Sequence, residues 1–399
     1  MGSEDDYARD LDGLAIMATV MVSAVEVRAT SFHADVYHLG GKLTVQRVFP
    51  RAWHFRNADG WILTVTTAFY DGPLAIRTNR ASLKSLPVEP GMPASIDHDA
   101  LTIGTLQISL DGAHAWSPRR AEDAPPLSFS ALQRDVEALT RLSVARPSVP
   151  APSVARPSSA GRTEFGDPLR SAMGEGPHLG VSRSKSRSTR HDDLRVVAGT
   201  EPRATGQSGA LWLQCATTHI ETLLDALVHM DERAIQASVL GLLGLGPGLT
   251  PAGDDLLCGL LVGLQVFGRR APRLGEWATQ SAAMVARVTE RAAPERTTAL
   301  SRTLLHYAAR SVVIDPLLDV VCTLGSGDPA SQGYTQWTTQ AGSARGATQA
   351  GSARRVPGLD ELRVIGHSSG SDMLAGALLA ARAVLEQEKM VGSALVYPA

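Results

Sequence analysis

The sequence predicts an α+β protein, with a small β-rich barrel or sandwich at the N-terminus and a helical domain at the C-terminus. Residues 13–120 hold short runs rich in Val, Ile, Thr and aromatic residues, separated by Gly, Pro and Asp, which is typical of strands. Residues 208–325 and 357–399 instead carry apolar residues at spacings of three and four, which indicates helices. Two low-complexity segments interrupt the chain, and we expect both to be disordered.

The composition is that of a folded protein with reduced thiols. The chain has 399 residues, of which 44% are hydrophobic, so it is long enough for two or three domains with real cores. A formal net charge of -2 gives no global field that would attract nucleic acid or an anionic membrane. Cys215, Cys258 and Cys322 match neither a disulfide framework nor a zinc pattern. We therefore expect a cytoplasmic protein that binds neither nucleic acid nor membrane.

The N-terminal region predicts a flexible tail over 1–12 and a β-rich domain over 13–142. The apolar run "GLAIMATVMVSAV" follows the acidic "SEDDYARDLD", whereas a signal peptide needs a positive lead-in, and the run is too short to span a bilayer. We expect it to be a buried strand or short helix. Further strands are expected in "LTVQRVF", "WILTVTTAFY", "LAIRT" and "LTIGTLQISL", and the helix "SALQRDVEALTRL" ends the domain.

The two low-complexity segments separate these parts. Residues 143–207 are rich in Ser, Pro and Arg and contain "SVARPS" twice, so they predict a disordered linker. A solvated linker is the favoured interpretation, although the local positive charge would also suit an acidic partner. Residues 326–356 contain "TQAGSAR" twice and predict a surface insertion within the helical domain of 208–399. That domain has helical patterns in "LWLQCATTHIETLLDALVHM", "EWATQSAAMVARVTERAA", "ERTTALSRTLLHYAARS" and "SDMLAGALLAARAVLEQE".

The stretch "GLGPGLTPAGDD" at 244–255 is the first candidate site. Thr250 followed by Pro251 predicts an N-cap and a first helical residue, which puts Asp254 and Asp255 in the first turn, where the helix dipole favours negative charge. Capping alone accounts for Asp254 but leaves the glycines unexplained. A glycine-rich loop with free N–H groups at a helix head is also a cradle for an anion. The P-loop and G-x-G-x-x-G fingerprints do not match. Substrate-binding candidates here are Gly246, Gly248, Thr250, Gly253 and Asp254.

A second stretch, "GSDMLAG" at 370–376, repeats the pattern of "GDDLLCG" at 253–259. Asp255 aligns with Asp372, and each is followed four residues later by a glycine on the same helix face. Small residues allow close helix approach, so we expect the two helix heads to meet and form one polar site. The alternative is a coincidence of residues common at helix starts. The expected lining is Thr250, Asp255, His367, Ser368, Ser369, Gly370 and Asp372, with Asp255, Asp372, His367 and Ser368 as catalytic candidates.

Two further patterns leave alternatives open. "GHSSG" fits a nucleophile elbow if "RVI" is a strand, but no histidine follows Ser368, so a serine hydrolase would have to use an upstream residue such as His306. In "ERTTALSRTLLHYAAR" the hydroxyls and a guanidinium suit an anionic substrate, and they suit ordinary helix capping almost as well. The candidates there are Arg296, Thr297, Thr298 and Ser301.

Three motifs in order, "GLGPGLTPAGDDLLCGLL", "RTTALSRTLLHYAARS" and "GHSSGSDMLAGALL", resemble the AllH-type family, a subunit of oxamate carbamoyltransferase. The resemblance covers most of 208–399 apart from the insertion, and the N-terminal part fits more loosely. It implies that the chain is a subunit of a multi-subunit enzyme in purine and allantoin nitrogen salvage. That enzyme interconverts oxalurate and phosphate with oxamate and carbamoyl phosphate.

Those anionic substrates call for helix-head N–H groups and an arginine. No cofactor is firmly indicated. If a metal ion binds, oxygen ligands without a His/Cys cluster favour Mg²⁺ over Zn²⁺. The alternative to a catalytic role is a non-catalytic subunit that binds a small anion or acts as a scaffold.

Overall fold

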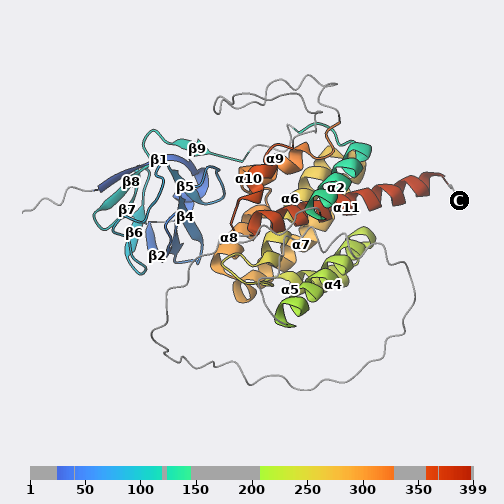
Figure 1. Cartoon of the computed structure of the whole chain (residues 1–399), viewed down its shortest axis with the longest axis horizontal. Coiled ribbons are helices and arrows are strands. Elements are labelled where there is room, and N and C mark those ends of the chain that lie inside the picture. The colour runs from blue at the N-terminus through green and yellow to red at the C-terminus, as the bar shows by residue number, and fades with distance from the viewer. Residues whose placement is uncertain are drawn as a thin grey trace, which may run out of the picture.

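The computed structural model describes residues 25–39, 41–118, 124–144, 207–327, 356–366 and 368–396. These residues form two hydrophobic cores, one among the strands and one among the helices, and Figure 1 shows the two parts side by side. A strand barrel followed by a helical region confirms the predicted fold class. The tail at 1–12, the apolar run before Val25, nearly all of the linker and residues 328–355 of the insertion lie outside the described residues.

The strands close into a barrel. In the described part of the chain they form one 9-stranded sheet in the order β5-β4-β3-β2-β6-β7-β8-β1-β9, and β5 also pairs with β1. That additional pairing closes the sheet from β5 round to β1, and β9 is an extra strand beside β1. The strands are β1 (Val25–His33), β2 (Lys42–Val48), β3 (Ala52–Asn57), β4 (Ile62–Thr66), β5 (Ala75–Thr78), β6 (Pro93–Ile96), β7 (Ala100–Ile103), β8 (Leu106–Ser109) and β9 (His114–Trp116).

Alternating side chains fill the barrel interior. In β2, Leu43 and Val45 point inward between exposed neighbours, as expected for a strand with one buried face. Trp53 and Phe55 of β3 are fully buried in the same core. The run "LTIGTLQISL" divides into β7 and β8 at Gly104, which has a φ of 56° and makes the turn. The barrel is therefore a packed core and not an open channel.

The remaining elements are helical. After the short 3₁₀ helix η1 (Ala34–Leu39), all of the described helices follow the barrel, and none of them is long and apolar enough to cross a membrane. They are α2 (Phe129–Val144), α4 (Gln207–His229), α5 (Glu232–Leu242), α6 (Ala252–Arg270), η3 (Pro272–Leu274), α7 (Gly275–Arg296), α8 (Ala299–Ala308), α9 (Asp315–Thr323), α10 (Leu359–Arg363) and α11 (Ser369–Val396).

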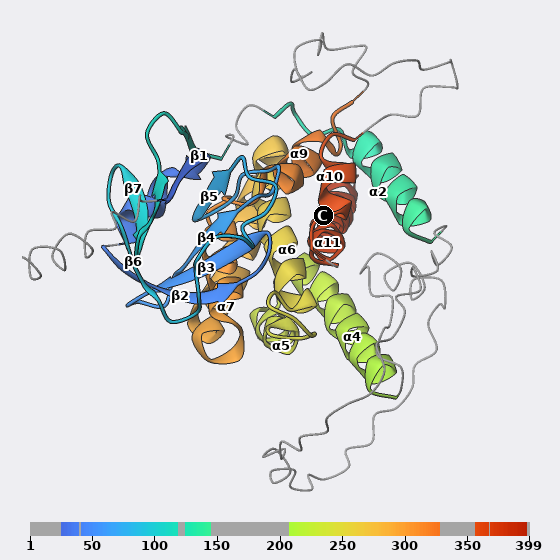
Figure 2. The same cartoon turned by 60° about the vertical axis from the view of Figure 1, so that its left-hand side comes forward.

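Helix α6 lies at the centre of the helical part. It is buried along nearly its whole length, as is typical of a helix that is apolar on all sides. Helix α11 packs along it, and both views show the other helices arranged around this pair (Figures 1 and 2). Helix α2 also belongs here, because Leu132, Val136 and Leu139 join the helical core. The expected boundary at 142, which assigned this helix to the β-rich domain, therefore does not follow the packing.

The barrel and the helices meet along α8. The backbone N–H of Ile62 donates to the Thr303 hydroxyl at 3.1 Å, and the Tyr307 hydroxyl donates to the Asp35 carboxylate at 3.0 Å. The guanidinium of Arg302 lies 4.6 Å from the ring centre of Trp61. These contacts hold α8 between the barrel and α6, so the position of its first turn is fixed from both sides.

Candidate functional site

Helix α6 begins one residue later than expected, and Thr250 has a different partner from the predicted one. The N-cap residue is Pro251, and no side chain caps this helix. The Thr250 hydroxyl instead lies 2.9 Å from the hydroxyl of Ser369, the first residue of α11. The predicted N-cap role of Thr250 is therefore wrong, because a residue 119 positions away takes its hydrogen bond. The same contact brings the heads of α6 and α11 together.

The glycine loop before α6 requires glycine at several positions. Gly244, Gly246 and Gly248 have φ values of 75°, 112° and 109°, which residues with a side chain rarely adopt. At Gly244 there is also no room, since a Cβ there would lie 2.1 Å from the carbonyl oxygen of Arg296. The loop is thus pressed against the junction between α7 and α8.

Asp254 holds this loop in place. Its Oδ1 accepts a hydrogen bond of 2.7 Å from the N–H of Gly244, and its Oδ2 accepts one from the Thr297 hydroxyl. Burial raises the pKa of Asp254, and these two donors together with the Ser301 hydroxyl oppose the rise. Because both oxygens have partners within the chain, Asp254 has a structural role in this arrangement and is the least available of the three acids.

The backbone N–H groups at the two helix heads are largely occupied. The N–H of Gly253 donates to Leu245, and those of Asp254 and Asp255 both donate to the Pro251 carbonyl. On α11, the N–H of Gly370 donates to Ile365 and that of Asp372 to Ser368. The expectation of free N–H groups in the first turn of α6 is therefore wrong for these positions, because the turns close on their own carbonyls.

Asp255 and Asp372 are buried acids whose hydrogen bonding is incomplete. Their exposed fractions are 1% and 2%, and within the described residues the Oδ2 of each has no hydrogen-bond partner. Burial raises the pKa of Asp255 to about 8, against the opposing effect of the Ser369 and Thr250 hydroxyls. Burial likewise raises the pKa of Asp372 to about 7, opposed by the Ser368 hydroxyl. Burial without a cation favours the neutral form of a carboxyl group, so both acids hold a proton at slightly acidic pH, and Asp255 largely keeps it at neutral pH.

Close packing between α6 and α11 brings these two acids to the same end. A Cβ on Gly259 would lie 1.9 Å from the carbonyl oxygen of Met373, and one on Gly376 would lie 1.8 Å from that of Leu256. The two glycines follow Asp255 and Asp372 by one helical turn. The negative charge of Asp372 also contributes to raising the pKa of Asp255, which is consistent with neighbouring carboxyl groups.

The third candidate cluster divides between two roles. The Thr298 hydroxyl caps α8 by accepting from the N–H of Ser301 at 3.1 Å and donates to the Leu249 carbonyl at 2.7 Å. Thr297 is extended and ends α7, and α8 begins directly after Thr298, so these hydroxyls lie at a helix start as expected. Arg296 is exposed and donates to the Leu240 carbonyl at 3.2 Å, away from the two acids. The hydroxyls therefore support the glycine loop, and the arginine does not contact it through its side chain.

The structure also tests the nucleophile elbow at Ser368. The residues before it are the end of α10 and a turn, whereas the motif requires a strand. The strand expected at "RVI" is absent, and the serine hydrolase interpretation loses its structural context. His367 lies outside the described residues.

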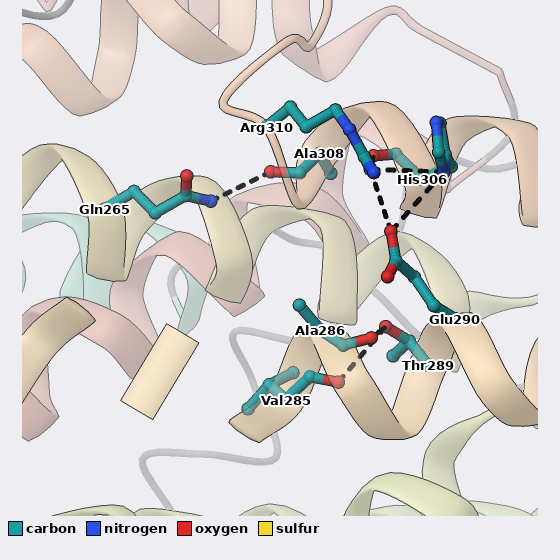
Figure 3. Close-up of polar contacts among 8 residues, drawn as sticks. All are labelled: Gln265, Val285, Ala286, Thr289, Glu290, His306, Ala308 and Arg310. Carbon is teal, nitrogen blue, oxygen red and sulfur yellow. Dashed lines mark hydrogen bonds and ion pairs between the residues drawn. The ribbon is translucent and has the colours of Figure 1, made fainter. Parts of the chain in front are cut away.

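His306, the upstream histidine considered for such a triad, has other contacts. Figure 3 shows it on α8 beside Glu290 of α7 and Arg310: the carboxylate lies 3.4 Å from the His306 Nδ1 and 2.8 Å from the Arg310 Nη1. The His306 ring also lies beside the Trp61 ring, with 4.6 Å between ring centres and an angle of 50° between the ring planes. Burial and the two neighbouring arginines, Arg310 and Arg302, lower its pKa, and Glu290 opposes them. His306 therefore belongs to the contacts that fix α8.

Two surface cavities lie elsewhere on the helical part. One of about 260 Å³ is lined by α5 and α7, and one of about 400 Å³ is lined by α2 and α11. Neither cavity is lined by Asp255 or Asp372, and the burial of these two acids shows that their site is closed. Among the residues that the structure describes, no group of three His, Cys, Asp or Glu could hold a metal ion.

Comparison with known families matches both parts of the chain. A family model described as oxamate carbamoyltransferase subunit AllH matches residues 242–352, which include the glycine loop, α6, α7 and α8. A second model, described as the AllH family N-terminal domain, matches residues 25–115, which span β1 to β9. No solved structure matches the chain.

Proposed function

The chain belongs to the AllH family, and from this membership we propose that it is a subunit of a carbamoyl-transferring enzyme of the oxamate carbamoyltransferase kind. It works with other subunits and binds a small anionic substrate at the heads of α6 and α11. The observation that carries the proposal is the pair of buried acids, Asp255 and Asp372, each with an oxygen that has no partner in the described chain. The proposal includes a cytoplasmic location and a role in purine and allantoin nitrogen salvage.

The reaction needs a proton at one defined atom. When phosphate attacks the carbamoyl carbon of oxalurate, a C–O bond forms, the C–N bond to oxamate breaks, and the departing nitrogen gains the proton that phosphate loses. In the reverse direction the oxamate nitrogen attacks carbamoyl phosphate and gives up that proton. A side chain that transfers a proton is most effective when its pKa lies near the working pH. Asp372, with a pKa raised to about 7, meets this condition, and Asp255, at about 8, comes close to it.

Protonation of the two acids also removes their electrostatic repulsion of an anionic substrate. Two carboxylates would repel an anionic substrate, but a neutral carboxylic acid donates a hydrogen bond to it, as a buried acid does in some oxyanion holes. The Thr250, Ser368 and Ser369 hydroxyls lie at the same place and hydrogen-bond to each other or to the two acids. Binding at this site therefore favours an anion that accepts hydrogen bonds.

Access to the site requires movement of a loop. The acids are closed off in this structure, and the segment above the α6 head is the glycine loop, in which Pro247 and Gly248 are exposed. Gly246 and Gly248 give that loop backbone freedom. We place substrate access between this loop and the α10–α11 turn.

Magnesium is a further component to test. If Mg²⁺ binds together with a phosphate group, Asp255 and Asp372 are the oxygen ligands at hand, and they would have to lose their protons first. That requirement opposes metal binding at this site near neutral pH. The proposed proton transfer does not depend on it.

A non-catalytic role is the second candidate. The closed site and the two cavities on other faces favour it, because a scaffold needs no access to the acids. In that case the chain would bind a small anion or support a catalytic subunit. The serine hydrolase alternative is not proposed, since the strand before Ser368 is absent.

Isotope exchange in the reconstituted multi-subunit enzyme separates the two candidates. The measurement is exchange of labelled phosphate into carbamoyl phosphate in the presence of oxamate, which accepts and returns the carbamoyl group, with wild-type chain, with Asp255→Asn and with Asp372→Asn. Loss of a proton-transferring group costs about 10²- to 10⁴-fold in rate, so we expect a fall of that size for at least one variant. Asp225→Asn, at an exposed carboxylate of α4, is the matched control and leaves exchange unchanged. Unchanged exchange in both site variants would exclude the acids from catalysis and favour the non-catalytic role.

A further inference from the structure

The loop–helix unit that leads into α6 is repeated at α11. In the first unit the N–H of Gly253 donates to Leu245 at 2.9 Å, and in the second the N–H of Gly370 donates to Ile365 at 3.3 Å. A Cβ on Gly253 would lie 1.9 Å from the Leu242 carbonyl oxygen. A Cβ on Gly370, the corresponding residue of α11, would lie 1.7 Å from the Leu362 carbonyl oxygen of α10. Each helix therefore starts with a glycine packed against the end of the preceding helix, two residues before its acid.

The contacts between α6 and α11 are reciprocal as well. Gly259 packs against Met373, and Gly376 packs against Leu256. When Asp255 is aligned with Asp372, the two glycines are equivalent positions, and so are the two residues that they contact. One turn further on, Gly263 meets Ala380. The two helices thus run in the same direction and are related by an approximate internal twofold axis between them. Asp255 and Asp372 are equivalent positions on either side of that axis.

The described surroundings of the two acids contain no cation. Arg296 donates to the Leu240 carbonyl, and Arg302 donates to the Asp59 carbonyl and lies over the ring of Trp61. The other titratable groups that face the acids within the described residues are Asp254 and Cys258, both on α6. Burial raises the pKa of the Cys258 thiol, so it too is neutral. The site as described offers hydrogen-bond donors and no positive side chain.

We infer that this site holds the oxalyl unit of the substrate, the two adjacent carbonyl carbons common to oxamate and oxalurate, with Asp255 and Asp372 each donating to an oxygen at one end of it. The inference rests on the proposed function and names which half of the substrate pair the site takes. The oxalyl unit is planar and has two similar ends, which matches two equivalent donors across the internal axis. It carries one negative charge, which neutral donors and two helix heads can accommodate.

Phosphate does not fit these surroundings. The N–H groups of both helix heads are largely occupied and the described residues offer no cation, so the desolvation of a phosphate dianion beside two buried acids would not be compensated. Carbamoyl phosphate would therefore bind through groups outside this pair of helix heads, which another subunit of the enzyme is placed to supply. This chain would then recognise the acceptor of the carbamoyl group.

Calorimetric titration of the full-length chain tests the assignment, using oxamate, acetate and inorganic phosphate as separate ligands. We expect oxamate to bind, and acetate, which has one acceptor end, and phosphate to bind at least tenfold more weakly. Asp255→Asn and Asp372→Asn each keep a hydrogen-bond donor, so the affinity for oxamate should stay within about tenfold of wild type. Asp255→Leu and Asp372→Leu each remove the donor and should each weaken oxamate binding about 10- to 100-fold. Asp225→Asn is the control at an exposed acid.

A pH series keeps the test decisive if a leucine variant does not fold. Wild-type affinity for oxamate should fall as the pH rises through about 7 to 8, because the two acids lose the protons they donate. The double variant Asp255→Asn/Asp372→Asn has no titrating acid at the site and should show no such fall. Binding of phosphate without oxamate, or wild-type affinity that rises with pH, would overturn the inference and leave the proposed function standing. Absence of binding by any of these ligands, to the chain and to the reconstituted enzyme alike, would contradict both.

Discussion

Replacing Asp255 by asparagine should stabilise the protein, and increasingly so as the pH rises. Asp255 is 1% exposed, and burial raises its pKa from the ordinary value of 3.8 to about 8. Between roughly pH 5 and pH 7 the folded protein therefore keeps a proton that the unfolded chain has released. The free energy of unfolding then falls by about 1.4 kcal/mol for each pH unit through this one group.

The magnitude follows from the width of that window. Over two pH units the loss is about 3 kcal/mol, and asparagine, which carries no titrating proton, removes it. The difference in unfolding free energy between Asp255→Asn and wild type should thus grow by about 3 kcal/mol from pH 5 to pH 7. A change of that size corresponds to a shift of about 6–12 °C in melting temperature for a domain of this size. Asp372→Asn should behave in the same way over a slightly narrower range, since its pKa is raised to about 7.

Thermal unfolding followed by circular dichroism at 222 nm reports the helical part. Histidines titrate in the same window with the opposite sign: burial lowers the pKa of His54 to about 4, so its contribution to stability is lost as the pH falls. This contribution is common to wild type and variant and cancels in the difference. Asp225→Asn, at an exposed acid, should give a flat difference. A flat difference for Asp255→Asn as well, or one that shrinks with rising pH, would refute the argument that burial keeps this acid neutral.

Three further predictions concern packing. Gly259→Ala should lower the unfolding free energy by about 3 kcal/mol or more, because the new methyl would lie 1.9 Å from a carbonyl oxygen of α11. The control Gly392→Ala, with nothing within 4 Å of the new methyl, should raise the unfolding free energy by up to about 1 kcal/mol. Equal effects of the two variants in urea unfolding would contradict the close approach of α6 and α11. Gly244→Ala should lower the melting temperature more than Gly248→Ala. Both glycines have positive φ, but a Cβ at 244 would clash with a carbonyl oxygen at 2.1 Å, whereas one at 248 would have a carbonyl oxygen at 3.9 Å; equal melting temperatures would contradict this. Tyr307→Phe removes a 3.0 Å hydrogen bond to the barrel and should cost about 1 kcal/mol, seen as a lower melting temperature, and no change would show that this contact does not hold the barrel on α8.

Local sequence patterns were sufficient to predict the strands and helices and the close contact between α6 and α11. Strands and helices follow from periods of two and three to four, and the expected close contact between α6 and α11 follows from glycines four residues after Asp255 and Asp372. The hydroxyls before each helix were also found from the sequence, because Ser and Thr are common at helix starts. What these positions do as a site stays a prediction.

Long-range partners could not be predicted in this way. Thr250 has the local preferences of an N-cap, but its hydroxyl contacts Ser369, and nothing near it in the sequence indicates that partner. Closure of the barrel depends on β5 pairing with both β4 and β1, which no single strand encodes. Helix α2 follows the barrel in sequence but packs on the other core, because its apolar face matches α11. The occupied N–H groups at the α6 head likewise depend on how the glycine loop folds back.

The crystal structure of the full-length chain with oxamate, grown near pH 6.5, tests the central claim most directly. We expect one oxamate between the heads of α6 and α11, with an oxygen at each end within hydrogen-bond distance, about 2.5–3.0 Å, of the Asp255 and Asp372 carboxyl groups. Oxamate bound in the groove between α2 and α11 instead, with the two acids still closed off, would contradict it.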